Sequence, residues 1–268
     1  MFNLTPMVKN ILIINVAVHL ILTVLGGFGD KISEIGSVYY LFSDHFFIFQ
    51  YVTYMWLHGG FMHLLFNMIG LIVFGPMLEQ VWGYKKFLTY YLIVGIGAGL
   101  FYGGADIIQN RNLEADTEAY YMATSAERFY QYVYSHKSRN FNLEALDEFA
   151  YQYEDNPSNS ALKEKSISIV KEIHFALTER HSMLGASGAI MGILLAFGML
   201  FPNRELMLLI PPMPIKAKYL VFFYGAYQVY KAINPTQGDN VSYLTHIGGL
   251  IVGFIVLKYW QKKHGNFY

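Results

Sequence analysis

The feature that most constrains the fold is a series of apolar runs separated by polar or charged residues. Hydrophobic residues make up 54% of the 268 residues, and charged residues only 14%. Six runs are long enough, or nearly so, to cross a hydrocarbon layer about 30 Å thick as helices; they lie at 9–27, 60–82, 87–105, 185–202, 217–233 and 243–260. We therefore predict an all-α, polytopic membrane protein with six transmembrane helices.

The distribution of basic residues predicts the orientation of these helices. Lysine and arginine gather before the first run, after the second, between the fourth and fifth, and after the sixth: Lys9, Lys85, Lys86, Arg204, Lys216, Lys218, Lys258, Lys262 and Lys263. These places share one side of the membrane if the helices alternate in direction. Because positive loops stay inside, we expect both termini in the cytoplasm, and a bacterial inner membrane. The formal net charge of zero argues against a nucleic-acid partner.

A polar segment, 106–182, separates the third run from the fourth and is expected to face outward. It contains thirteen acidic and eight basic residues. Two apolar series with helical spacing predict two helices that each bury one face: Leu143, Leu146, Phe149 and Tyr153, then Ile167, Val170, Ile173 and Leu177. The polar stretch 155–160 should end the first helix and cap the second. We predict a small helical insertion whose tyrosines pack in its core and interfaces rather than forming a binding platform.

These boundaries divide the chain into three parts. Residues 1–105 form the first three transmembrane helices, 106–182 the insertion, and 183–268 the last three helices. Within the first part, 28–48 is too polar to span the membrane and too aromatic for an ordinary loop. We expect it to lie in the outer interface.

Few polar side chains interrupt the apolar runs, and each is a candidate site because such groups are costly in a membrane. The second run contains His63 and Asn67, with His58 just before it; the fourth contains Ser187, and the sixth contains His246. These three runs all begin on the outer side if the helices alternate. His63, Asn67, Ser187 and His246 should therefore lie at a similar depth, within reach of water.

Small residues predict which helices approach each other. Gly188 and Gly192 in the fourth run, and Gly249 and Gly253 in the sixth, have the four-residue spacing that permits close helix packing. His246 shares a face with the second pair, so Ser187 and His246 meet if the two glycine stripes face each other. Alternatively, the glycines only pack helices and the serine hydroxyl bonds a backbone carbonyl.

The same residues would suit nucleophilic catalysis. His246 could accept the proton of Ser187, and the Ser187 N–H, His63 and Asn67 could stabilise an oxyanion. No Asp or Glu lies in the runs near His246, so a Ser–His dyad is expected. The chain has no cysteine and no HExxH motif, which excludes thiol catalysis and argues against a metal site or other cofactor. Glu79 is expected to be a structural partner of loop backbone or of Lys85.

In its motifs the chain resembles the rhomboid family of intramembrane serine proteases. The resemblance is carried by HGGFMHLLFNM and FGPMLEQVWG in the second run, LGASGAIMG in the fourth and THIGGLIVG in the sixth. It implies a six-helix core with Ser187 as nucleophile, His246 as base, and His63, Asn67 and the Ser187 amide as oxyanion donors. It also implies cleavage of membrane-anchored proteins in the bilayer near its outer face, with the fifth helix and a loop near 234–245 admitting the substrate.

Further positions in these motifs are expected to pack the site or contact substrate: Gly185, Gly188, Met191, Gly249 and Gly253. The chain departs from the family at Met191, where many members have an aromatic residue that supports the histidine ring. It also has Phe49 and Gln50 where many members have Trp-Arg in the first outer loop.

Two questions stay open at this stage. The alternative to a protease is a rhomboid-like protein that binds transmembrane helices without cutting them, although such proteins usually lack the serine or histidine. The insertion 106–182 either contacts substrate or a partner, or has a purely structural role.

Overall fold

The computed structural model describes residues 4–136, 141–180, 182–207, 212–234 and 242–264. These residues are mainly helical, and one short antiparallel pair joins β1 (Glu205–Met207) to β2 (Pro214–Lys216). The helices are α1 (Pro6–Val24), α2 (Gly27–Gly36), α3 (Gln50–Thr53), the 3-10 helix η1 (Tyr54–Trp56), α4 (Phe61–Gln109), α5 (Leu113–Met122), α6 (Ala126–Ser135), α7 (Leu143–Asp155), α8 (Ser160–Phe175), the π-helix η2 (Ala176–Arg180), α9 (Ser187–Leu200), α10 (Ala217–Ile233) and α11 (Tyr243–His264).

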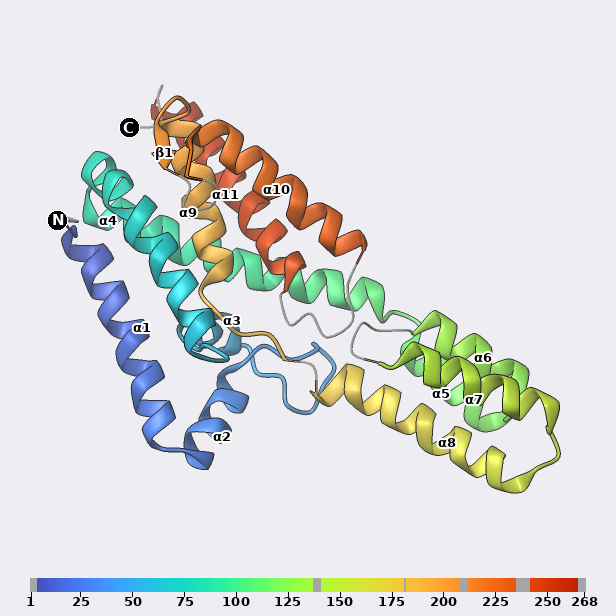
Figure 1. The fold of residues 1–268 in the computed structure, drawn as a ribbon. Helices are drawn as coiled ribbons and strands as arrows, with labels where there is room; N and C mark the ends of the chain where they lie inside the picture. Colours follow the sequence, from blue (N-terminus) through green and yellow to red (C-terminus); the bar gives the residue numbers. More distant parts are fainter. Residues whose placement is uncertain (1–3, 137–140, 181, 208–211, 235–241, 265–268) are drawn as a thin grey trace.

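The helices form two groups, each with its own apolar core. Figure 1 shows α1, α4, α9, α10 and α11 in a large bundle, and α5 to α8 in a smaller lobe beside it. Buried side chains of α4, α9 and α11, such as Leu71, Val94, Ile193 and Leu257, form the core of the bundle. A separate cluster, which includes Tyr120, Phe129, Phe149 and Val170, forms the core of the lobe.

Three helical segments of the described residues are long and apolar enough to cross a membrane: Pro6–Val24, Phe61–Met122 and Tyr243–Lys263. The second of these contains both the second and the third predicted runs, because α4 continues through a kink. The fourth and fifth runs form α9 and α10, which have 14 and 17 residues and are shorter than a typical span.

The kink in α4 lies at Gly83, whose φ of 76° and ψ of 160° are not helical. A positive φ is easily adopted only by glycine, so this residue lets the chain change direction. Figure 1 shows the two halves of α4 running in different directions from the kink.

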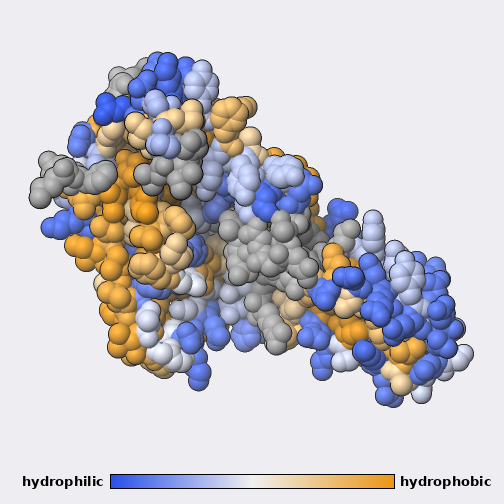
Figure 2. All heavy atoms as spheres, in the orientation of Figure 1, coloured by the Kyte–Doolittle hydropathy of each residue, from blue (hydrophilic) through white to orange (hydrophobic). Residues whose placement is uncertain are grey.

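The outer surface of the bundle is strongly apolar. Figure 2 shows hydrophobic residues over the flank of the bundle, and hydrophilic ones toward its ends and over much of the α5–α8 lobe. Exposed apolar side chains occur on α1, α10 and α11: Ile13, Ile14, Leu20, Ile21, Val24, Phe222, Phe223, Ile233, Ile251, Phe254 and Ile255. A surface of this kind is stable against lipid rather than water.

Two contacts join α4 to α1 and to α11 at the end of the bundle where lysine residues gather. The buried carboxylate of Glu79 accepts hydrogen bonds from the backbone N–H of Met7 and of Val8, both at 2.9 Å, and from the Thr5 hydroxyl. It thus satisfies N–H groups that every helix leaves free at its N-terminus, here that of α1. Lys86 lies 4.8 Å from the centre of the Trp260 ring, which ties the α4 kink to the end of α11.

The helices predicted within 106–182 are confirmed. α7 ends at Asp155 and α8 begins at Ser160, where the Asn159 side chain accepts hydrogen bonds from the N–H groups of Ala161 and Leu162. Both predicted apolar series contribute to the core of the lobe, although Leu143 is exposed. The tyrosines divide into two sets: Tyr120, Tyr132 and Tyr153 are buried, whereas Tyr121, Tyr130, Tyr134 and Tyr151 are exposed.

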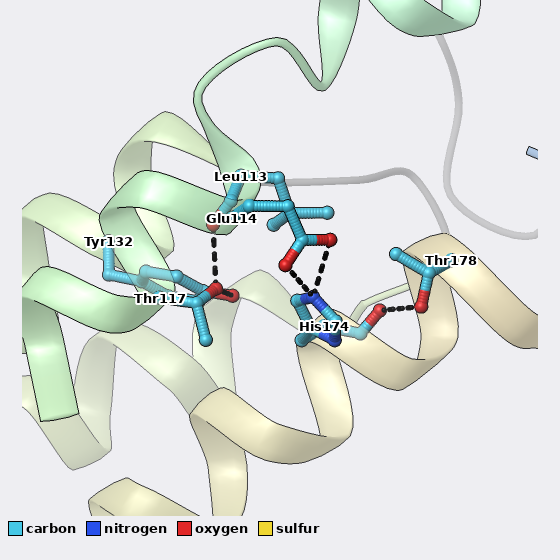
Figure 3. A network of polar contacts seen from close by, with 6 residues as sticks. All are labelled: Leu113, Glu114, Thr117, Tyr132, His174 and Thr178. Carbon is cyan, nitrogen blue, oxygen red and sulfur yellow. Dashed lines mark hydrogen bonds and ion pairs between the residues drawn. The ribbon is translucent and has the colours of Figure 1, made fainter. Parts of the chain in front are cut away.

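Polar contacts hold the lobe together where α5 meets α6 and α8 (Figure 3). The Thr117 hydroxyl donates to the carbonyl of Leu113 and also lies 2.9 Å from the Tyr132 hydroxyl. The His174 ring on α8 contacts the Glu114 carboxylate on α5 at 3.0 Å. Deeper in the lobe, the buried Tyr120 hydroxyl donates a hydrogen bond to the hydroxyl oxygen of Ser166.

Candidate active site

The chain makes a tight, glycine-dependent turn immediately before Ser187, the first residue of α9. Gly185 has a φ of 128°, and its N–H donates to the carbonyl of Tyr54 at 2.9 Å. A Cβ added at Gly185 would lie 2.6 Å from Cε1 of His63. The turn therefore places the start of α9 directly against the His63 ring of α4.

The two glycine stripes face each other. A Cβ added at Gly249 of α11 would lie 2.1 Å from the backbone oxygen of Gly188 on α9. One at Gly188 would lie 3.0 Å from Cγ2 of Thr245, and one at Gly253 would lie 3.2 Å from Cα of Gly192. Because these contacts involve residues adjacent to Ser187 and His246, the close approach of α9 and α11 occurs at the level of both candidate catalytic residues.

The His246 ring is held on two sides. It is 8% exposed, and its Nδ1 lies 2.8 Å from Oε1 of Gln228 on α10. The Tyr243 ring stands nearly perpendicular to it, with the ring centres 6.4 Å apart. Met191, which takes the place of the family's aromatic residue, is buried in the bundle.

Gln228 was missed by the sequence reasoning. A signal was present, since an amide within an apolar run is a site candidate by the same rule that selected the histidines. The residue is 1% exposed, so its polar side chain needs a protein partner.

The proposed oxyanion donors differ in their surroundings. Asn67 is 5% exposed, and its Nδ2 has no hydrogen-bond partner within the described part of the chain. An unpaired buried N–H group is costly, which suits a donor kept for a ligand. His58 packs edge-on against His63, with ring centres 5.2 Å apart.

The segment between α2 and α3 is anchored despite its departure from the family pattern. The Gln50 side chain is fully buried and donates to the carbonyls of Ile35, at 3.0 Å, and His45, at 2.8 Å. Val38 and Met183 exchange two backbone hydrogen bonds, which join this loop to the segment leading to Ser187. Gln50 thus anchors the segment between α2 and α3 at a position where many family members have an arginine.

Part of the predicted substrate-admitting loop near 234–245 cannot be placed here, since residues 235–241 lie outside the described residues. The next described segment begins at Ser242, whose hydroxyl oxygen lies 2.6 Å from the hydroxyl oxygen of Thr245. That contact lies in the first turn of the helix that bears His246.

The chain matches the family model of the Rhomboid domain over residues 46–107 and 166–262, which is more than half of its length. The match includes all five polar candidates in the apolar runs and leaves out 108–165, the greater part of the predicted insertion.

Individual relatives match over shorter stretches. The chain is 45% identical over 49 residues to "RHOMBOID-like protein 5" of Arabidopsis thaliana, covering 18% of this chain and 16% of the relative. It is 40% identical over 73 residues to "Rhomboid protease AarA" of Providencia stuartii, covering 26% of each chain. It is 44% identical over 45 residues to "Putative rhomboid protease YdcA" of Bacillus subtilis (strain 168), covering 17% of this chain and 23% of the relative.

The matched stretches span about a quarter or less of the length of these curated relatives. The family assignment rests on the domain match and agrees with the apolar helices and the exposed apolar surface. The chain is an integral membrane protein and belongs to the rhomboid family.

Proposed function

We propose that this protein is a serine endopeptidase that hydrolyses peptide bonds in or next to transmembrane segments, with Ser187 as nucleophile and His246 as base. The observation that carries the proposal is the contact between Gly188 and Gly249. Only where two helices approach this closely can short side chains on neighbouring residues come within hydrogen-bond reach. The protease names of two bacterial relatives agree with this activity.

In the proposed reaction, the Ser187 oxygen attacks the carbonyl carbon of the scissile bond and its proton passes to Nε2 of His246. The negative charge that develops on the carbonyl oxygen is stabilised by the Ser187 N–H, by His63 and by the unpaired Nδ2 of Asn67. The C–N bond then breaks as His246 returns the proton to the leaving amine. Water attacks the acyl-enzyme, again with His246 as base, and releases a carboxylate and free Ser187.

We also propose that six transmembrane segments place this site near the outer face. Gly83 would separate the second and third segments within α4, and α9 and α10 would be the fourth and fifth. Glu79 and Lys86 join the basic ends of three helices, which favours one cytoplasmic side with both termini. The α5–α8 lobe would then face outward, and 1–105, 106–182 and 183–268 would be the three parts of the chain.

Replacing Ser187 by alanine tests the proposal. We expect Ser187→Ala to abolish cleavage of a membrane-anchored substrate in proteoliposomes without changing the thermal unfolding of the purified protein. A fluorophosphonate probe should label the wild type and not the variant, because only an activated serine reacts. Cleavage by the variant would contradict the assignment, and an unlabelled, inactive wild type would instead support a non-proteolytic binder of transmembrane helices.

For the lobe, we propose a role in substrate choice, since it leads through η2 directly to the turn before Ser187. Replacing residues 113–177 by a flexible linker should then change the ranking among membrane substrates more than the rate on a generic unfolded substrate. An equal loss on both kinds of substrate would assign the lobe a structural role.

A further inference from the structure

Gln228 is an exception on its helix. Of the described α10 residues, only Ala217 and Gln228 are buried, and the rest of the helix mostly presents apolar side chains to its surroundings. A buried amide that faces no partner would cost free energy, so its location against the bundle calls for an explanation. The partner is the Nδ1 atom of His246, at 2.8 Å.

The chemistry of an amide oxygen determines what this contact does. Oε1 of glutamine only accepts hydrogen bonds, so the facing Nδ1 of a neutral imidazole must carry the hydrogen. The other ring nitrogen, Nε2, then has the free lone pair that a general base needs. We propose that Gln228 is a positioning residue that holds His246 in its Nδ1-protonated tautomer, an inference that rests on the proposed serine protease function.

An amide in this position has a physical advantage over a carboxylate. A buried carboxylate needs several partners to offset its loss of hydration, whereas a neutral amide orients the ring without a second buried charge. The cost is weaker stabilisation of the imidazolium formed during catalysis. Gln228 would therefore act mainly through ring orientation and tautomer.

The test uses the purified full-length protein with ¹⁵N-labelled histidine. In the wild type, the His246 signals should be those of the Nδ1-protonated tautomer, identified by their loss in His246→Ala. In Gln228→Met, which keeps the side-chain length and removes the acceptor, the tautomers should mix. Turnover, kcat, should fall by about 10–100-fold with KM unchanged, the range seen when an outer partner of a metal-bound histidine is lost.

Further variants make the interpretation specific. Gln228→Glu keeps the accepting oxygen, so it should restore the tautomer and move the pH–rate profile to higher pH, because a carboxylate favours the protonated ring. Val229→Ala, at an exposed neighbour on the same helix, should change neither measurement. If Gln228→Met does not fold, Gln228→Ala, which also removes the acceptor, should weaken the tautomer preference in the same direction.

An unchanged tautomer in Gln228→Met, or a rise in KM alone, would overturn the inference. The spectrum does not depend on catalysis, so the inference and the proposed function fail separately. An inactive wild type that still loses its tautomer preference in the variant would contradict the protease alone.

Discussion

Adding one methyl group at Gly249 should disable the site by separating its two central helices. The new Cβ would lie 2.1 Å from the backbone oxygen of Gly188, whereas a carbon atom rarely comes closer to such an oxygen than about 3.3 Å. Since backbone cannot swing aside as a flexible side chain does, α9 and α11 would have to separate by roughly 1 Å. A misplacement of about 1 Å between reacting groups costs on the order of 100-fold in rate, and we expect that loss in Gly249→Ala.

The assay is cleavage of a membrane-anchored reporter in proteoliposomes, together with the rate of fluorophosphonate labelling of Ser187. Gly225→Ala is the matched control, because a Cβ there would lie 3.5 Å from Leu250 in ordinary contact. Both proteins should show a cooperative thermal transition, so that activity is compared between folded chains. Cleavage and labelling by Gly249→Ala within about twofold of the wild type would refute the argument that this close approach brings Ser187 to His246.

Three further substitutions test other parts of the site and of the bundle. Asn67→Ala should lower kcat by roughly 10–1,000-fold with little change in KM, because its free N–H is proposed to bind the oxyanion; an unaltered kcat would give Asn67 a packing role. Gly185→Ala should reduce activity at least about 10-fold, because it strains a positive φ and its new Cβ would meet the His63 ring. The control Gly59→Ala should keep its activity, because a Cβ there would lie 3.7 Å from Cδ1 of Leu184, in ordinary contact. Glu79→Ala should lower the free energy of unfolding in an SDS titration by about 1–3 kcal/mol, because it leaves the N–H groups of Met7 and Val8 unpaired, and an equal effect of the exposed control Glu34→Ala would contradict this.

The sequence was most informative where a function depends on short spacing along one helix. The glycines of α9 and α11 lie on one face at four-residue intervals, so their mutual contact could be predicted from the chain alone. The helix break before Ser160 was equally local, since Asn159 caps the helix that immediately follows it. In both cases the interacting groups are fixed by helical geometry rather than by long-range packing.

Contacts between distant segments could not be predicted in the same way. Gln228 lies on a different helix from His246, and nothing in its local sequence specifies which residue it will face. Likewise, Gln50 reaches the carbonyls of Ile35 and His45, and only the folded loop brings these three residues together. The sequence also did not predict that α4 continues through Gly83, which joins two predicted runs in one element.

The candidate site is held by two kinds of contact that respond differently to movement. α9 and α11 meet through glycine backbone, where many atoms touch and any separation is resisted along the whole stripe. α10 instead reaches the site through the hydrogen bond between Gln228 Oε1 and His246 Nδ1, and such a bond weakens steeply once its geometry is lost. A displacement of α10 by about 1 Å would therefore release the His246 ring while leaving the backbone around Ser187 in place. In the proposed mechanism, the packed pair α9 and α11 would fix the approach of Ser187 to His246, whereas the tautomer of His246 would depend on the position of α10.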